Sequence, residues 1–428
     1  MLTIKLPSDQ ILPVEVGWTV RWDDEVEGCW TNHRQAHVTS RSILEMIANV
    51  LLAALPILSA LNGVAAAPVN GSIYAPPPPP GGVDTNATSP APVYAPDSDF
   101  DYQSLALALH QEWIELDLFH YGLATFSDAE FDEYGINAEQ RSLIQFMANQ
   151  EVGHATLISN IVGGYPGGAP KQCTYKYNFT TVPEFVDFCQ RLTRWGESGV
   201  YGFLPHLDSR PAAQLLLQSI STEARQQMIF RQLSGLFPMP VYFEAGIPQT
   251  FAWTLLSPYI VSCPAENTPI AFNIFPSLTV VNGPSGIDEA FQKLPYPTGG
   301  PAITHNRTAL SYPGRLVELA WETPGQVVGP YNQTTAIGDL VTTNASAPLY
   351  VAWTSQLNTT YTLLTVTGNG TGTTIQPNGT VFDSTPDDAI VNGTSFVTIV
   401  SEQLPVTSYN LSLINDYVVA GPSIYQAS

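Results

Sequence analysis

The fold is decided by residues 137–162, NAEQRSLIQFMANQEVGHATLISNIV. Apolar residues recur in this stretch at spacings of three and four, which is the period of an amphipathic α-helix. The same spacing places Glu151 and His154 on the apolar stripe. The stretch therefore predicts a packed helix that carries one buried carboxylate and one imidazole on a single face.

Three neighbouring stretches repeat this pattern. Residues 101–123, 182–207 and 211–233 each have an apolar stripe at helical spacing. Each stripe contains one acid in its middle: Glu112, Glu197 and Glu223. Together the four stretches predict a helix bundle with its acids directed inwards.

Four acids in one apolar interior need a shared partner, because an isolated buried carboxylate is costly or is neutralised by a shift in its pKa. A Glu on each of two helices and Glu-x-x-His on each of the other two is the ligand pattern of di-iron and di-manganese bundles. Gln226 stands where the second histidine of that pattern would be. Its oxygen suits manganese better than softer metals, so a mononuclear or asymmetric site becomes a second possibility.

The sequence thus predicts one or two ions of iron or manganese in the bundle. The candidate ligands are Glu112, Glu151, His154, Glu197, Glu223 and Gln226. The alternative is a bundle without metal, in which the buried acids pair with Arg225 or with tyrosine and glutamine side chains. Glu115 lies one turn from Glu112 and could replace it, although it falls to one side of the stripe.

Four motifs carry a family resemblance: EWIELDLFHYGL, NQEVGHATLI, RWGESGVYGFLPHLDSR and EARQQMIFRQL. On these motifs the chain resembles the ferritin-like domain of secreted fungal stress-response or sexual-development proteins, a family related to plant desiccation-response proteins. The resemblance implies a ferritin-like fold and a role in oxidative or nutrient stress. It implies no particular reaction.

Local signals support the helix boundaries. Asn137 with Gln140, and Thr181 with Glu184, have the spacing of capping boxes, and Ser209 is a third suitable cap. The connection between the second and third helices is long enough for the crossover of ferritin-like topology.

Composition limits the partners. Lys and Arg number 15 against 37 acids, and the formal net charge is -22. This charge argues against nucleic acid or an anionic membrane surface as a partner. No Gly-x-Ser-x-Gly, phosphate-loop, His-Glu-x-x-His or dinucleotide motif is present, so the sequence does not favour a hydrolase or a nucleotide-binding enzyme.

Residues 1–98 are expected to precede the folded domains. Residues 46–67 have the apolar core and small-residue end of a signal peptide, and residues 1–45 are interpreted as a doubtful extension before the true start at Met46. An internal signal anchor is the alternative. Residues 68–98 are a Pro-rich linker. Because the C-terminus also lacks a hydrophobic tail, we predict a secreted protein without a stable membrane anchor.

The predicted architecture is α+β and multidomain. Residues 99–268 form the ferritin-like four-helix bundle with a wrapping segment, and residues 269–428 form an antiparallel β-sandwich-like module of short β-branched runs. The strands are expected in SLTVV, RLVELAW, PLYVAWTS, TYTLLTV, SFVTIVS and YNLSLI.

Glycosylation is expected mainly on the β-rich module. Eleven Asn-x-Ser/Thr sequons are present: Asn70, Asn86, Asn178, Asn306, Asn332, Asn344, Asn358, Asn369, Asn378, Asn392 and Asn410. The nine from Asn178 onward are the predicted glycosylation sites. Cys173 and Cys263 fall in loop-like surroundings and are expected to form a disulfide in an oxidising compartment, whereas Cys189 is expected to be a buried free thiol.

Two hypotheses from different classes remain. The first is a secreted metalloprotein that binds iron or manganese and turns over peroxide or a small substrate under stress. The second is a non-catalytic extracellular or cell-wall protein that uses the bundle as a scaffold. A ferritin-type cage of many subunits is not expected, because the Pro-rich arm and the glycosylated module leave little room for shell packing.

Overall fold

The structure is a computed structural model, and it describes residues 93–285, 287, 310–335, 347–378, 391 and 393–427. All described residues belong to one compact unit, which spans residues 88–428. The doubtful extension, the predicted signal peptide and most of the predicted linker lie outside the described residues. The sequons outside them are Asn70, Asn86, Asn306, Asn344 and Asn392.

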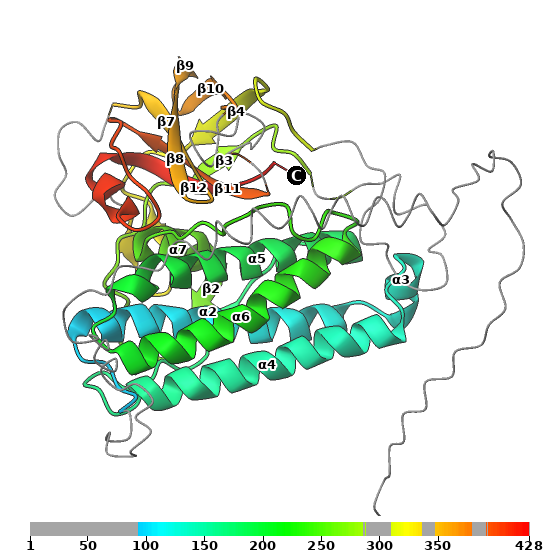
Figure 1. The fold of residues 1–428 in the computed structure, drawn as a ribbon. Helices are drawn as coiled ribbons and strands as arrows, with labels where there is room; N and C mark the ends of the chain where they lie inside the picture. Colours follow the sequence, from blue (N-terminus) through cyan, green and yellow to red (C-terminus); the bar gives the residue numbers. More distant parts are fainter. Residues whose placement is uncertain are drawn as a thin grey trace, which may run out of the picture. The chain divides into compact units, whose positions relative to one another are not determined.

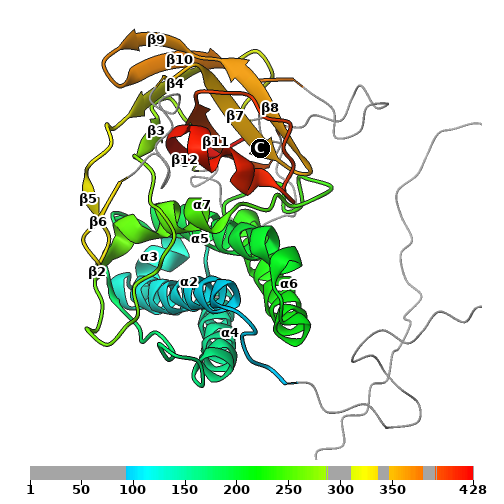
Figure 2. The ribbon, with the colours of Figure 1, turned by 90° about the vertical axis from the view of Figure 1, so that its left-hand side faces the viewer.

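Four long helices form the first part of this unit (Figure 1). They are α2 (Asp99–Thr125), α4 (Ala138–Val162), α5 (Val182–Phe203) and α6 (Arg210–Leu233). Helix α2 packs most extensively on α4, and α5 packs most extensively on α6. Figure 2 shows α2, α4 and α6 nearly end-on. A short helix, α3 (Asp128–Glu133), lies in the connection between α2 and α4.

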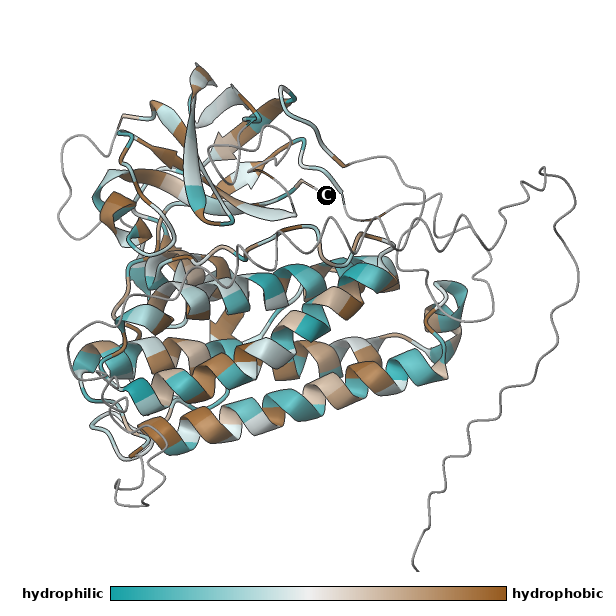
Figure 3. Ribbon diagram, in the orientation of Figure 1, coloured by the Kyte–Doolittle hydropathy of each residue, from teal (hydrophilic) through white to brown (hydrophobic). Residues whose placement is uncertain are grey.

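The apolar stripes predicted from the sequence face the bundle interior. Along α4, apolar residues recur at helical spacing (Figure 3), and Ile144, Met147 and Ile158 are buried together with Glu151. Burial of such side chains contributes roughly 1.5–3 kcal/mol each. Packing of the stripe therefore stabilises α4 and at the same time places its acid inside the bundle.

The predicted caps are confirmed. Asn137 and Gln140 form a capping box at the start of α4, and Thr181 and Glu184 form another at the start of α5. Ser209 accepts a hydrogen bond from the first turn of α6. Since each of these side chains satisfies backbone N–H groups that have no partner within the helix, the three helices begin where their caps stand.

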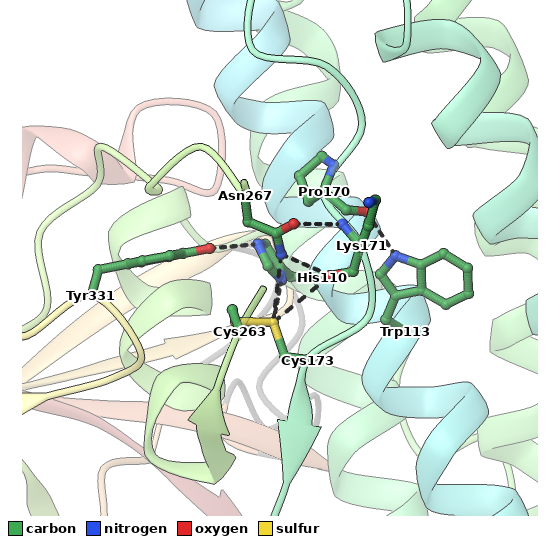
Figure 4. Close-up of a disulfide and its surroundings, with 8 residues drawn as sticks. All are labelled: His110, Trp113, Pro170, Lys171, Cys173, Cys263, Asn267 and Tyr331. Carbon is green, nitrogen blue, oxygen red and sulfur yellow. Dashed lines mark hydrogen bonds between the residues drawn. A yellow bond between two sulfur atoms is a disulfide. The ribbon is translucent and has the colours of Figure 1, made fainter. Parts of the chain in front are cut away.

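A disulfide links the crossover between α4 and α5 to the segment that follows β2 (Ile260–Ser262). Strand β1 (Thr174–Tyr175) pairs with β2, and the disulfide joins Cys173 to Cys263 beside this ladder (Figure 4). This is the pair expected from the sequence. Cys189 is a buried free thiol, also as expected. The wrapping segment contains a short helix, α7 (Gln249–Leu256).

The C-terminal part contains two antiparallel sheets of four strands each. The first has the order β3 (Leu278–Val280), β4 (Leu316–Trp321), β10 (Thr371–Ile375) and β9 (Thr365–Gly368). The second has the order β12 (Val418–Gln426), β11 (Thr394–Val400), β7 (Tyr350–Ser355) and β8 (Asn358–Leu363). A pair of two-residue strands, β5 (Val327–Val328) and β6 (Gln333–Thr334), stands apart from both sheets.

Side chains from both four-stranded sheets form one apolar cluster. Val317 of β4 lies in this cluster with Trp353 of β7 and Val397 of β11. The rings of Trp353 and Tyr425 meet edge to face at 5.1 Å. A shared core between two antiparallel sheets is the arrangement of a β-sandwich, so the predicted fold class is confirmed.

One strand prediction is wrong. YNLSLI was expected to be a strand, but residues Leu411–Tyr417 form a 3₁₀-helix. Leu411 and Ile414 are buried whereas Ser412 and Leu413 are exposed, and this spacing of three is the period of a 3₁₀-helix.

The last strand, β12, was not predicted, because Gly421 and Pro422 interrupt its apolar run. In the structure these two residues lie where the register of β11 and β12 shifts. Proline is tolerated at such irregularities, since its missing N–H is not needed there. Within the described ranges, no helix is long and apolar enough to cross a membrane.

Candidate metal centre

Three helices bring a histidine and three carboxylates together. His154 Nδ1 lies 3.2 Å from Glu151 Oε2 and 3.3 Å from Glu112 Oε2. Glu223 Oε1 lies 3.6 Å from the same nitrogen. One ligand atom from each of these residues lies within 4.8 Å of every other. Helices α2, α4 and α6 thus converge on one point through the side chains that the sequence predicted. We call these four residues the histidine cluster.

The histidine cluster is shielded from solvent. Glu112, Glu151 and Glu223 are buried, and the side chain of His154 is 12% exposed. Two carboxylate oxygens, Glu112 Oε2 and Glu223 Oε1, are fully buried and accept no hydrogen bond. A buried oxygen without a donor is destabilising, so these atoms favour a bound cation among them.

The pKa shifts in the histidine cluster also favour a bound cation. Burial raises the pKa of Glu112 to about 8 and raises the pKa of Glu223 well above its usual range. Burial alone would lower the pKa of His154, but the carboxylates of Glu112 and Glu151 beside its ring raise it to about 12. The metal-free centre therefore retains protons that a divalent cation would displace.

A threonine orients the histidine. Thr222 Oγ1 donates a hydrogen bond to the carbonyl oxygen of Ser219 and lies 3.0 Å from His154 Nε2. Since the hydroxyl proton is used for Ser219, the threonine oxygen accepts from His154 Nε2–H. A neutral imidazole then has its lone pair on Nδ1, the nitrogen that faces the three carboxylates. Metal-binding histidines commonly donate their other N–H in this way, so the centre fits a metal ion.

Gln226 supports a ligand residue. Its Nε2 donates to Glu151 Oε1 at 2.5 Å and to Gln150 Oε1 at 3.3 Å, while its own Oε1 has no hydrogen-bond partner. The predicted ligand position is therefore buried and adjacent to the histidine cluster. In this arrangement, however, the amide holds Glu151 in place by donating a hydrogen bond.

Glu197 does not join the other three acids. It is fully buried on α5, but Arg194 Nη2 of the same helix lies 2.8 Å from Glu197 Oε2. Arg194 Nη1 lies 2.5 Å from Glu244 Oε2, which is in the segment between α6 and α7. The expected convergence of four carboxylates holds for three of them. The arginine considered as a partner from the sequence, Arg225, is exposed on α6.

Glu115 is a fifth buried glutamate among the described residues, and the stripe did not place it among the ligands. It is fully buried on α2, and Gln111 Nε2 donates to its Oε1 at 2.8 Å. Gln111 is in turn held by a hydrogen bond from Trp195 Nε1. Burial, and then the charges of Glu151 and Glu112, raise the pKa of Glu115 well above its usual range. Its position one turn after Glu112 was the signal that could have placed it inside.

His110 and the two disulfide sulfurs form a second close group (Figure 4). His110 Nδ1 lies 3.7 Å from Cys173 Sγ, and Tyr331 Oη lies 3.5 Å from the other ring nitrogen. Because the sulfurs are bonded to each other, they are not thiolate ligands. This group therefore surrounds the disulfide at the connection between α4 and α5.

Comparison with known proteins places the chain in a family. A model of the ferritin-like domain matches residues 98–236, which include α2 to α6. Protein rds1 of Schizosaccharomyces pombe is 54% identical over 355 residues, which are 82% of this chain and 86% of that protein. The chain belongs to the rds1 family. In this rds1-family chain the entire histidine cluster falls within the ferritin-like match.

Proposed function

We propose that the bundle of this rds1-family protein binds iron or manganese through Glu112, Glu151, His154 and Glu223. The observation that carries this proposal is the approach of their four ligand atoms to within 4.8 Å of one another. Carboxylate and imidazole donors suit iron and manganese, and both ions occur in bundles with this ligand pattern.

The chain's own residues prepare the centre for such an ion. Apolar packing of three helices keeps bulk water away from it, Thr222 directs His154 Nδ1 inwards, and Gln226 holds Glu151. When bound, iron or manganese supplies Lewis acidity and one-electron redox chemistry at this buried position. The oxidative or nutrient stress role that the family resemblance implies fits such chemistry.

Metal analysis of full-length protein purified without chelators tests this function. We expect iron or manganese in the wild type, little metal in Glu151→Gln and His154→Ala, and wild-type metal content in Glu139→Gln. Glu139 is a matched control, since it is an exposed acid on the same helix as Glu151. Wild-type protein with less than about a tenth of an equivalent of any transition metal would leave the non-catalytic scaffold as the function.

We further propose that the protein is secreted and glycosylated. The signal-peptide-like stretch at 46–67 and the disulfide support secretion. Five described sequons have an exposed asparagine: Asn178, Asn332, Asn358, Asn369 and Asn378. Asn410 is only partly exposed, and its Oδ1 accepts a hydrogen bond from Thr407 N. N-terminal sequencing and glycan-removal mass spectrometry test this proposal, and a mature chain that retains Trp18 contradicts it.

A further inference from the structure

We infer that the bundle holds one metal ion, because the guanidinium of Arg194 supplies the positive charge that a second ion would supply. This inference rests on the proposed metal function and concerns the other half of the same interior. We call Arg194, Glu197 and Glu244 the arginine cluster.

Two members of the arginine cluster, Arg194 and Glu197, are buried, and the third, Glu244, is exposed. Arg194 is 3% exposed, and its two terminal nitrogens lie 2.8 Å from Glu197 Oε2 and 2.5 Å from Glu244 Oε2. A guanidinium is charged at all physiological pH values, and its planar fork suits two carboxylates at once. Glu197, the acid that the ligand pattern assigns to a second ion, therefore already has a cation 2.8 Å from its Oε2.

A second dication would face this fixed charge. Glu197 would have to exchange the guanidinium for the metal, and the freed arginine would remain buried beside a like charge. Among the described residues, Glu197 and Glu115 also belong to no group of ligand atoms as close as the histidine cluster. The histidine cluster would thus take its positive charge from a bound ion, whereas the arginine cluster takes it from Arg194.

The amide N–H groups of the two glutamines beside the second half are used by neighbouring glutamates. Gln226 donates to Glu151, and Gln111 donates to Glu115. Helix α5 also approaches α2 closely at Gly196, where an added Cβ would lie 2.7 Å from Gln111 Nε2 and from Glu115 Oε1. Gln226 stands where the ligand pattern has its second histidine, so this half offers oxygen donors without the imidazole that completes the first half.

Arg194 is thus a positioning residue that sets the number of ions. Two substitutions separate its role from that of Gln226. Gln226→His restores the imidazole but keeps the arginine, and we expect it to bind one ion. Arg194→Gln combined with Gln226→His removes the fixed charge as well, and we expect it to bind two ions. Arg194→Lys keeps the charge and should bind one.

The test is manganese stoichiometry on the full chain, measured by equilibrium dialysis and elemental analysis, with electron paramagnetic resonance as a second readout. Wild type should bind one Mn²⁺ with the spectrum of an isolated ion, and the double variant should bind two with the spectrum of a coupled pair. Arg225→Gln, an exposed arginine on α6, should match the wild type. Circular dichroism confirms that each variant is folded.

Three outcomes overturn the inference. Two ions in the wild type would show that Arg194 does not exclude a second ion. Two ions in Gln226→His alone would show that the wild type lacks the second ion because residue 226 is not histidine. A folded double variant that still binds one ion would also contradict it. No ion in wild type or in any variant would instead remove the proposed metal function itself, and the inference with it.

Discussion

The histidine cluster and the arginine cluster both contain buried acids, but the negative charge of these acids is compensated in different ways. In the histidine cluster, three buried carboxylates surround one imidazole. In the arginine cluster, Glu197 and Glu244 share the permanent cation of Arg194. Both halves use buried acids, but only the second contains its own fixed positive charge. The comparison teaches that a buried glutamate indicates a metal only after its nearest cation has been identified.

The largest expected effect concerns the arginine cluster. Arg194→Met should lower the free energy of unfolding by about 3–5 kcal/mol, because it leaves Glu197 buried without its partner. Urea denaturation followed by circular dichroism measures this change. Arg225→Met is the control and should change the value by less than about 0.5 kcal/mol, since Arg225 is exposed.

A double substitution tests the same ion pair between Arg194 and Glu197. Arg194→Leu with Glu197→Leu should recover part of the loss, because removing both partners leaves no unpaired charge at that position. A double variant less stable than Arg194→Met would contradict the assignment of the ion pair.

The histidine cluster should respond to metal where the arginine cluster does not. At a free Mn²⁺ concentration of about 100 times Kd, the free energy of unfolding should rise by about 2.7 kcal/mol. Thermal unfolding with and without Mn²⁺ measures the change. The increase should disappear in His154→Ala and persist in Glu139→Gln. An equal increase in His154→Ala would place the ion elsewhere.

The orientation of His154 gives an intermediate effect. Thr222→Val keeps the shape of the side chain but removes the acceptor for His154 Nε2–H. We expect Mn²⁺ affinity to fall about 10- to 100-fold, as for other residues that support metal ligands. Isothermal titration calorimetry measures the affinity. Unchanged affinity would show that Thr222 does not fix the ring.

The metal-free protein should lose stability as the pH rises. Burial raises the pKa of Glu112 from 4.5 to about 8, so the folded state holds this proton more tightly than the unfolded state. Its contribution is complete below about pH 4.5 and is lost as the pH rises through 8. The raised pKa of His154 acts in the same direction from 6.5 upwards.

The expected slope is at most about 1.4 kcal/mol per pH unit for each proton. Urea denaturation between pH 5 and 8 in the presence of a chelator measures it. Glu112→Gln should have a shallower slope. A wild-type stability that rises across this window would contradict the buried, protonated state of the histidine cluster.

The sequence predicted the bundle well, because periodicity and caps act locally. The stripes placed Glu112, Glu151 and Glu223 inside, and the caps gave the start of α4, α5 and α6. It did not predict the partner of Glu197, although Arg194 stands three residues before it on the same helix. The carboxylate of Glu244, which also holds Arg194, comes from a distant wrapping segment. Long-range pairing of this kind has no periodic signal.

The β-rich part shows the same limit. Alternating runs predicted most strands of the sandwich, but burial at spacing three makes residues 411–417 a 3₁₀-helix, and Pro422 concealed β12. In the bundle, Glu115 was placed beside the stripe, whereas the close approach of α5 at Gly196 buries it completely. Tertiary packing therefore decided these positions.

The most direct measurement is the manganese or iron content of the full-length wild-type protein, purified without chelators and compared with His154→Ala. The histidine cluster predicts close to one ion for each wild-type chain and a large loss in the variant. A wild-type chain without metal, or a variant that retains it, would contradict the assignment of a metal centre to Glu112, Glu151, His154 and Glu223.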